Sequence, residues 1–320
     1  MKRIIVFLFL INLIFAQEGF YKINSKPGAF TRIGASSKSI AMGNSTSAFN
    51  EGALIGLVNP ALSVFQKGHQ ILIDHSFLSL DRKFNLVSYT KKFNLDKKNH
   101  IAGLSIGLIN SGVSNIGEYD LEGTKLGEFS TSENLIFVSI GNKVSEKFVV
   151  GVTFKFYFYN LFQSLTASAL GFDVGIIYKL NDKIFISAML KDINARYTWD
   201  TTEIWGVNGN SWKEKFPLAK KIGLAYKFSE NLVITGEYEN LDSEINFLRC
   251  GAQYKIIENL YLRAGIDRLN LSDKHYPTRP SFGFSYNQEL IGYKFIFDYA
   301  YSSEPYSAAD RHSIGINLNL

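Results

Sequence analysis

The sequence is poor in several features that would point to common protein classes. Cys250 is the only cysteine among 320 residues, which excludes a disulfide scaffold. After residue 16 no run of about 18 apolar residues occurs, which excludes a bundle of membrane-spanning helices. No basic cluster exceeds a pair such as Lys91 and Lys92, so the formal net charge of +5 does not indicate a nucleic-acid partner. Apolar residues still make up 46% of the chain, too many for a disordered protein.

Motifs that support catalysis are missing as well. The histidines are His69, His75, His100, His275 and His312. None of them stands at the H-x-x-x-H spacing of a zinc site. The stretch from Gly34 to Ser37 lacks the G-x-S-x-G pattern of a nucleophile elbow. We therefore expect a protein that is not an enzyme and that carries no cofactor and no metal.

The first residues have the layout of a targeting segment. Lys2 and Arg3 precede a stretch that is apolar from Ile4 to Phe15 apart from Asn12, and Ala16 ends it. This order predicts a secretory signal peptide over residues 1–16. A transmembrane anchor is the alternative, but about a dozen apolar residues are too few to cross a bilayer comfortably.

The rest of the chain is rich in aromatic residues, with 26 Phe and 17 Tyr, and it alternates from about residue 70. Runs of roughly ten residues place apolar side chains on one face of a strand and polar or small ones on the other. In one run, Phe172, Val174 and Ile176 share a face, while Asp173 and Gly175 share the opposite one. Such runs predict an all-β fold.

Two architectures would use these strands. A soluble sandwich would bury the apolar faces against each other, whereas a membrane barrel turns them to lipid. The runs are about 10–13 residues long, which suits a tilted membrane strand better than a soluble one. Aromatic side chains such as Phe154, Phe156 and Phe158 repeat on the apolar face, as in the aromatic girdles of barrels. We therefore predict a transmembrane antiparallel β-barrel over residues 70–320.

About 14 runs can be counted, an even number as bacterial barrels require. Their approximate spans are 70–80, 83–93, 100–110, 132–143, 147–160, 167–180, 183–195, 216–228, 231–241, 244–256, 259–269, 278–288, 291–302 and 311–320. The long connections between them all fall at odd places in the order. They are residues 111–131, 196–215, 270–277 and 303–310. Long loops should therefore gather at one rim of the barrel, which is typical of the external side.

Residues 17–69 do not alternate, and small residues dominate them. The conspicuous positions are Gly34, Met42, Gly43, Asn59, Pro60 and Ala61. Apolar side chains such as Ile40, Leu54 and Phe65 need burial. We predict a short helical and looped plug inside the barrel mouth; the alternative is a flexible leader.

This segment carries a resemblance. The stretch from Arg32 to Leu62 resembles the opening of the PorV/PorQ family, a branch of the FadL-like outer-membrane barrels. Asn44 and Glu51-Gly52 depart from the pattern of that opening. The similarity continues through Leu170 to Tyr178 and reaches His312. No single motif is highly specific, but their order spans nearly the whole mature chain.

The resemblance implies a 14-stranded barrel in the lipid of the bacterial outer membrane, closed by an N-terminal plug. It further implies a role in type IX secretion, with secreted or surface proteins as partners. The alternative is a FadL-like transporter of long-chain fatty acids or other hydrophobic compounds. A porin-like structural protein with an open, wet lumen is a third interpretation.

Two groups of residues are candidate sites. Trp199, Trp205 and Trp212 fall in one predicted external loop, where they either sit at the lipid headgroup boundary or dock a partner protein. Charged residues of the lumen face form the second group, as a structural network or as a transport path. Its members are Asp173, Lys179, Glu237, Arg249, Arg263, Asp267, Lys294 and Asp298.

Overall fold

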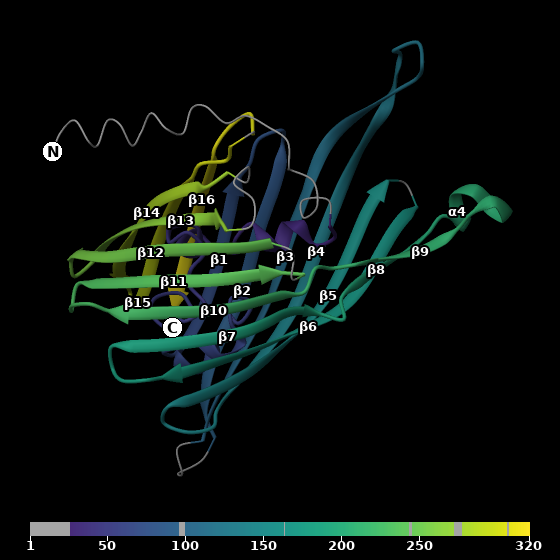
Figure 1. Cartoon of the computed structure of the whole chain (residues 1–320). Helices are drawn as coiled ribbons and strands as arrows, with labels where there is room; N and C mark the ends of the chain where they lie inside the picture. The colour runs from purple at the N-terminus through teal and green to yellow at the C-terminus, as the bar shows by residue number, and fades with distance from the viewer. Residues whose placement is uncertain (1–25, 96–99, 163, 243–244, 272–276, 306) are drawn as a thin grey trace.

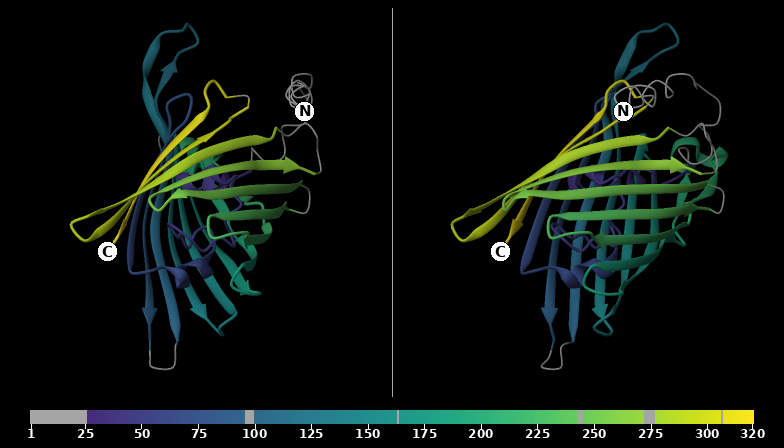
Figure 2. Two further views of the ribbon diagram at one scale, coloured as in Figure 1. Left: turned by 90° about the vertical axis from the view of Figure 1, so that its left-hand side faces the viewer. Right: turned by 60° about the vertical axis from the view of Figure 1, so that its left-hand side comes forward.

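The computed structural model describes residues 26–95, 100–162, 164–242, 245–271, 277–305 and 307–320. The predicted signal peptide lies outside these residues. The described chain forms a closed antiparallel barrel of 14 strands (Figures 1 and 2). The barrel strands are β1 (His69–Phe77), β2 (Arg82–Asn94), β3 (Ile101–Tyr119), β4 (Lys125–Lys143), β5 (Phe148–Phe162), β6 (Leu165–Lys179), β7 (Ile184–Ile193), β10 (Ala219–Lys227), β11 (Leu232–Leu241), β12 (Ile245–Ile257), β13 (Leu260–Asn270), β14 (Arg279–Leu290), β15 (Tyr293–Ser302) and β16 (Arg311–Asn319). None of the helices in these residues is long and apolar enough to cross a membrane.

The sheet closes into a barrel because neighbouring strands pair in sequence order and the first strand pairs with the last. Each strand pairs with the next along the chain, β7 pairs with β10, and β1 pairs with β16. The backbone N–H of His69 donates to the carbonyl of Leu320 at 3.1 Å, so β1 begins where β16 ends. We call this edge the terminal rim and the opposite edge the loop rim.

The period-two alternation predicted from the sequence is confirmed. In β6, Phe172 and Val174 are each 37% exposed on the outer face, while Asp173 between them is fully buried. The same alternation repeats around the wall because successive side chains of a strand point to opposite faces. Apolar side chains therefore cover the outside and polar ones face the lumen, as in membrane barrels.

Long connections gather at one rim, as predicted. The terminal rim carries the short turns 144–147, 180–183, 228–231, 258–259 and 291–292. The loop rim carries 194–218, 271–278 and 303–310. One predicted loop is wrong: residues 111–131 are not a long connection. After a bulge between Val113 and Ile116, pairing resumes at Ile116–Phe129, so β3 and β4 continue as a hairpin that projects beyond the wall (Figure 1).

The predicted loop 196–215 is also wrong in its detail, because it contains regular structure. It forms a hairpin of β8 (Arg196–Asp200) and β9 (Ser211–Lys215), with the short helices α4 (Thr202–Trp205) and η4 (Gly206–Asn208) at its tip. Strand β8 pairs with β6 at only two positions, and β9 pairs only with β8 among the described strands. Each strand has five residues, too few for the sequence pattern to indicate them.

The N-terminal segment (residues 26–68) fills the lumen with three short helices, drawn in purple inside the barrel in Figures 1 and 2. They are η2 (Ala29–Arg32), α3 (Ser37–Ala41) and η3 (Pro60–Phe65). Ser36 caps α3 by accepting from the N–H of Ser39. Most residues from Ser36 to Phe49 are buried, so the segment is packed against the inner wall.

A row of glycines lets η3 approach the wall closely. Gly103, Gly141, Gly151 and Gly175 pair directly with one another across β3, β4, β5 and β6. A Cβ atom on Gly151 would lie 2.7 Å from the backbone nitrogen of Ala61. Any larger side chain in this row would push η3 off the wall, because real Cβ atoms do not come so close.

Candidate functional site

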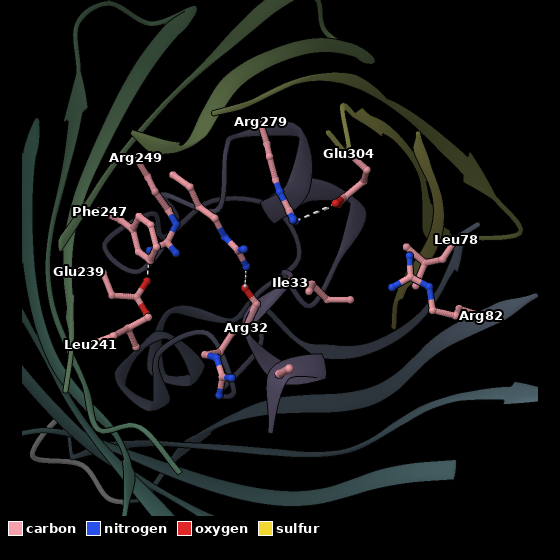
Figure 3. A pocket seen from close by; sticks show the side chains of 12 residues that line it. Arg32, Ile33, Leu78, Arg82, Glu239, Leu241, Phe247, Arg249, Arg279 and Glu304 are labelled. Atoms are coloured by element: carbon pink, nitrogen blue, oxygen red, sulfur yellow. Dashed lines mark hydrogen bonds and ion pairs between the residues drawn. The ribbon is translucent and has the colours of Figure 1, made fainter. Parts of the chain in front are cut away.

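A cavity of about 300 Å³ lies between the N-terminal segment and the loop-rim half of the barrel. We call it the arginine cavity (Figure 3). Its lining is Ala29, Arg32, Ile33, Leu78, Arg82, Glu239, Leu241, Phe247, Arg249, Arg268, Arg279 and Glu304. Five arginines face two glutamates, so the lining carries three positive charges in excess.

The lining comes from elements that end at the loop rim. Helix η2 and the residue after it supply Arg32 and Ile33 from the floor. The ends of β11 to β14 supply most of the wall, with Phe247 near the start of β12. Figure 3 shows these side chains pointing from the wall and from the floor into one space. The cavity therefore exists only because the N-terminal segment lies inside the barrel.

Arg249 is neutralised by carboxylates. Its Nε lies 2.5 Å from Asp267 Oδ1, and its Nη1 pairs with Glu239 and, at 3.4 Å, with Glu237 Oε1. Lys221 Nζ adds a second cation 2.8 Å from Glu237 Oε1. This cluster is buried, so its ions must pair with one another to offset the loss of water.

Arg279 is also paired with a carboxylate, with its Nη1 2.9 Å from Glu304 Oε2, and the other three arginines of the cavity bond to backbone carbonyls. Arg268 Nη2 donates to the carbonyl of Arg32 at 3.0 Å, and Arg32 Nη1 donates to the carbonyl of Pro27 at 2.8 Å. Arg82 Nε donates to the carbonyl of Ser79 at 3.1 Å. Arg268 also lies near a carboxylate, with its Nε 3.6 Å from Asp267 Oδ2, and Arg82 Nη2 donates to Ser79 Oγ at 3.3 Å. Burial lowers the pKa of Arg32, although a guanidinium remains protonated in proteins.

Two smaller spaces continue from the arginine cavity. A cavity of about 260 Å³ shares Arg82 and Ile33 with it and reaches Glu133 and Tyr159 on the wall. A pocket of about 60 Å³ shares Arg249 and extends toward Asp192 between the N-terminal segment and the wall. Together they give the lumen a branched space in its loop-rim half.

The terminal-rim half of the lumen is closed by apolar packing. Leu62 and Val64 of η3 are 2% and 4% exposed, and they pack with Val149 and Ile177 of the wall. Phe65 contacts Phe185 edge to face, with ring centroids 6.0 Å apart. Passage through the barrel therefore requires the N-terminal segment to move.

Two solved structures of similar architecture are a channel and a transporter. A "TodX deltaS2S3 mutant monoaromatic hydrocarbon channel" superposes with a TM-score of 0.61 and 14% identity, covering 89% of this chain and 97% of that one. The toluene transporter TodX of Pseudomonas putida gives 0.59 and 15%, covering 89% and 96%. No family model and no curated protein matches the sequence.

The described chain shares its closed 14-strand barrel with these two structures. At 14–15% identity the likeness concerns the fold alone. These comparisons do not support the PorV/PorQ interpretation of the sequence.

The structure brings two of the three candidate tryptophans together. The rings of Trp199 and Trp212 stack with centroids 6.1 Å apart across the β8–β9 hairpin. Trp199 is 4% exposed and packs on Tyr159 and Tyr197, whereas Trp205 on α4 is 65% exposed. Trp199 thus belongs to the interior, and it does not share one exposed patch with Trp205.

The residues of the predicted plug motif serve packing and turns. Asn59 caps η3 by accepting from the N–H of Ala61 at 3.0 Å, with Pro60 at the first helical position. Gly34 and Gly43 have φ of 99° and 59°, the left-handed region that glycine adopts most easily. The remaining motif residue is Met42, which is fully buried. None of these residues lines the arginine cavity.

The predicted lumen charges form several buried clusters. Arg249 joins Asp267 and Glu237 as described, and Arg263 Nη1 lies 2.7 Å from Asp298 Oδ1. Lys179 and Lys294 are not part of them. Lys179 lies at the terminal rim 2.6 Å from Asp182, and Lys294 is exposed near the same rim, because both strands reach water there.

Sequence reasoning missed the partner of Asp173. Lys155 Nζ lies 2.7 Å from Asp173 Oδ1 and 2.8 Å from Asp192 Oδ1. Tyr157 OH also donates to Asp192, at 2.6 Å. Lys155 alternates with Phe154 and Phe156, so the period-two pattern itself placed it on the lumen face. The pairing of Lys155 with both aspartates depends on the bulge between β6 and β7, and no sequence pattern predicts that bulge.

Proposed function

We propose that this chain is an outer-membrane channel for the uptake of hydrophobic compounds that carry an acidic group, with long-chain fatty acids as the first candidates. The observation that carries the proposal is the arginine cavity, which combines excess positive charge with apolar side chains such as Ile33, Leu78 and Phe247. The fold and the hydrocarbon-channel neighbours support a transport role.

The proposed placement is the bacterial outer membrane. The apolar outer face suits lipid, and the loop rim with its longer connections would face the exterior. The terminal rim, where the short turns gather, would then face the periplasm. In this orientation the arginine cavity opens on the side from which a compound arrives.

Binding would divide between two kinds of contact. The carboxylate would pair with guanidinium groups of the lining such as Arg82, which bonds to Ser79, and Arg268, which shares Asp267 with Arg249. The apolar tail would lie against Phe247 and Ile33 and leave water. Displacement of η3 from the terminal-rim half would then open the way to the periplasm.

Titration of the purified barrel in a neutral detergent with dodecanoate and with dodecanol tests the proposal. These ligands share a tail and differ in charge. Dodecanoate should bind, dodecanol should bind about tenfold or more weakly, and Arg82→Gln with Arg268→Gln should remove the difference. Lys147→Gln with Lys183→Gln is the matched control, since both lysines are exposed in turns of the terminal rim.

Equal binding of acid and alcohol, or binding of neither, would overturn the proposal. Binding of toluene without any preference for dodecanoate would instead favour a hydrocarbon channel.

A role in type IX secretion stays a prediction. Its contact surfaces would be the two hairpins of the loop rim, where Leu121 and Trp205 are exposed. Co-purification of a secreted protein with the intact barrel, lost on Trp205→Ala, would favour it.

A further inference from the structure

Polar side chains form a continuous row on the outer face of the wall. His75, Asn85, Asn110 and Asn134 pair directly across β1 to β4. His75 Nδ1 and Asn85 Oδ1 are 2.6 Å apart, and Asn110 Nδ2 donates to Asn134 Oδ1 at 2.7 Å. These side chains hydrogen-bond to one another along the wall, with Asn85 Nδ2 donating to Asn110 Oδ1 at 3.4 Å between the two closer pairs.

The register of this polar row is interrupted by the apolar Phe158 on β5 and resumes with polar residues on the next strands. In the same register come Phe158, Ser168, Thr198 and Lys213, on β5, β6, β8 and β9. The next outward-facing row, one step toward the terminal rim, is apolar and exposed throughout. Its members are Ile73, Val87, Leu108, Ile136, Phe156 and Leu170. This change marks the outer edge of the hydrocarbon belt on this side of the barrel.

A groove of about 440 Å³ crosses that edge beside the β8–β9 hairpin. It forms because β7 ends at Ile193, so the loop-rim half of β6 loses its neighbour and pairs with β8 at only two positions. Phe156 and Leu170 line its apolar part. Arg196 and Lys213 line its polar part, and among the described lining residues none is acidic. Lys213 pairs with Thr198 in the polar row, and Arg196 lies on the same face two residues nearer the apolar row.

We propose that this groove binds an anionic lipid of the outer leaflet, with its phosphate at Arg196 and Lys213. One acyl chain would lie against Phe156 and Leu170, where the exposed apolar surface runs toward the membrane centre. The guanidinium and ammonium groups complement a phosphate, and the long arginine side chain can extend from the edge of the belt to the headgroups.

The inner end of the groove is closed, which favours a resident lipid over a lateral path for the transported compound. Tyr157 stands there, fully buried and bonded to Asp192. Its ring packs on Phe216 and Tyr197, with centroids 4.7 Å and 6.3 Å away. A compound leaving the lumen here would have to displace this aromatic cluster and a buried ion pair.

Native mass spectrometry of the intact barrel from nanodiscs tests the proposal. One set of discs holds phosphatidylcholine alone and a second holds added phosphatidylglycerol. The wild type should retain phosphatidylglycerol at least tenfold more than phosphatidylcholine, and Arg196→Gln with Lys213→Gln should remove that preference. Lys147→Gln with Lys183→Gln loses the same charge at the opposite rim and should behave as the wild type. A heat-modified band shift on a gel shows that each variant is folded.

Two outcomes would overturn the proposal. One is equal retention of phosphatidylglycerol by the wild type and the Arg196/Lys213 variant. The other is slower dodecanoate uptake by the Arg196/Lys213 variant while its lipid retention stays unchanged. That result would assign the groove to the transported compound. The proposal does not depend on the arginine cavity, so failure of dodecanoate binding there leaves it standing.

Discussion

The two halves of the lumen are closed by different interactions although the same barrel surrounds both. In the terminal-rim half, η3 fits against a row of glycines and packs apolar side chains such as Leu62 on the wall. In the loop-rim half, charged side chains border open space, and Arg249 is held by three carboxylates. Close packing tolerates no ligand, whereas a charged cavity with apolar patches can hold one. The terminal-rim half is therefore the part that closes the lumen, and the loop-rim half is the part that contains the candidate binding site.

The largest effect is expected from Arg249→Met. The change leaves Glu237, Glu239 and Asp267 buried without their shared guanidinium, although Lys221 still neutralises part of the charge. Removing one partner of a buried ion cluster typically costs about 3–5 kcal/mol of unfolding free energy. Urea titration of the barrel in detergent micelles measures the loss. A loss in unfolding free energy smaller than that from breaking an exposed pair such as Lys125–Glu128 would show that water reaches the Arg249 cluster.

The matching change in the terminal-rim half is Leu62→Ala. Leu62 is 2% exposed in a cluster with Val64, Val149 and Ile177, so its truncation leaves a cavity. The expected cost is about 2–5 kcal/mol. Protease digestion of the folded barrel distinguishes where the loss falls. Faster cleavage within residues 26–68 with an intact wall would show that η3 detaches first, and a wall that opens together with η3 would contradict the division into two halves.

A smaller effect tests the glycine row directly. In Gly151→Ala the new Cβ would lie 2.7 Å from backbone atoms of Ala61 and Pro60, so η3 must shift at a cost of about 1–3 kcal/mol. Gly236→Ala is the matched control, because the nearest atom to its Cβ is 4.0 Å away. Urea titration should separate the two variants. Equal stability would mean that η3 is not held against the row.

The sequence predicted one half of this comparison better than the other. Alternation located the strand that contains Asp173, and the small residues around Asn59 indicated a segment inside the barrel. Both signals are local, because they depend on period and composition. The arginine cavity was not predicted, since Arg32 and Arg279 are 247 positions apart in the numbering and meet only after the segment folds into the barrel. Only Arg249 of its arginines was singled out, as one lumen charge among eight.

The smallest effect is expected at Lys38, which links two parts of the N-terminal segment by hydrogen bonds. Lys38 Nζ donates to the carbonyls of Glu51, at 2.8 Å, and of Ala53, and it lies 5.1 Å from the centre of the Phe49 ring. No carboxylate bonds to it in these contacts. Burial, helped by the nearby charge of Arg263, lowers the pKa of Lys38 from 10.5 to about 7.

This lowered pKa predicts that the packed segment becomes more stable as the pH rises. Above pH 7 the amine loses its proton in the packed state but keeps it when the segment is exposed to water, so the unfolded state binds more protons. A neutral amine still has two N–H donors for the carbonyls of Glu51 and Ala53. Between pH 7 and pH 8 the unfolding free energy should rise by about 1 kcal/mol, and the gain should continue until the pH reaches the ordinary lysine value. In Lys38→Met, urea titration at the two pH values should show no such gain. A wild type that weakens over this range, or a variant that keeps the gain, would contradict the assignment to Lys38.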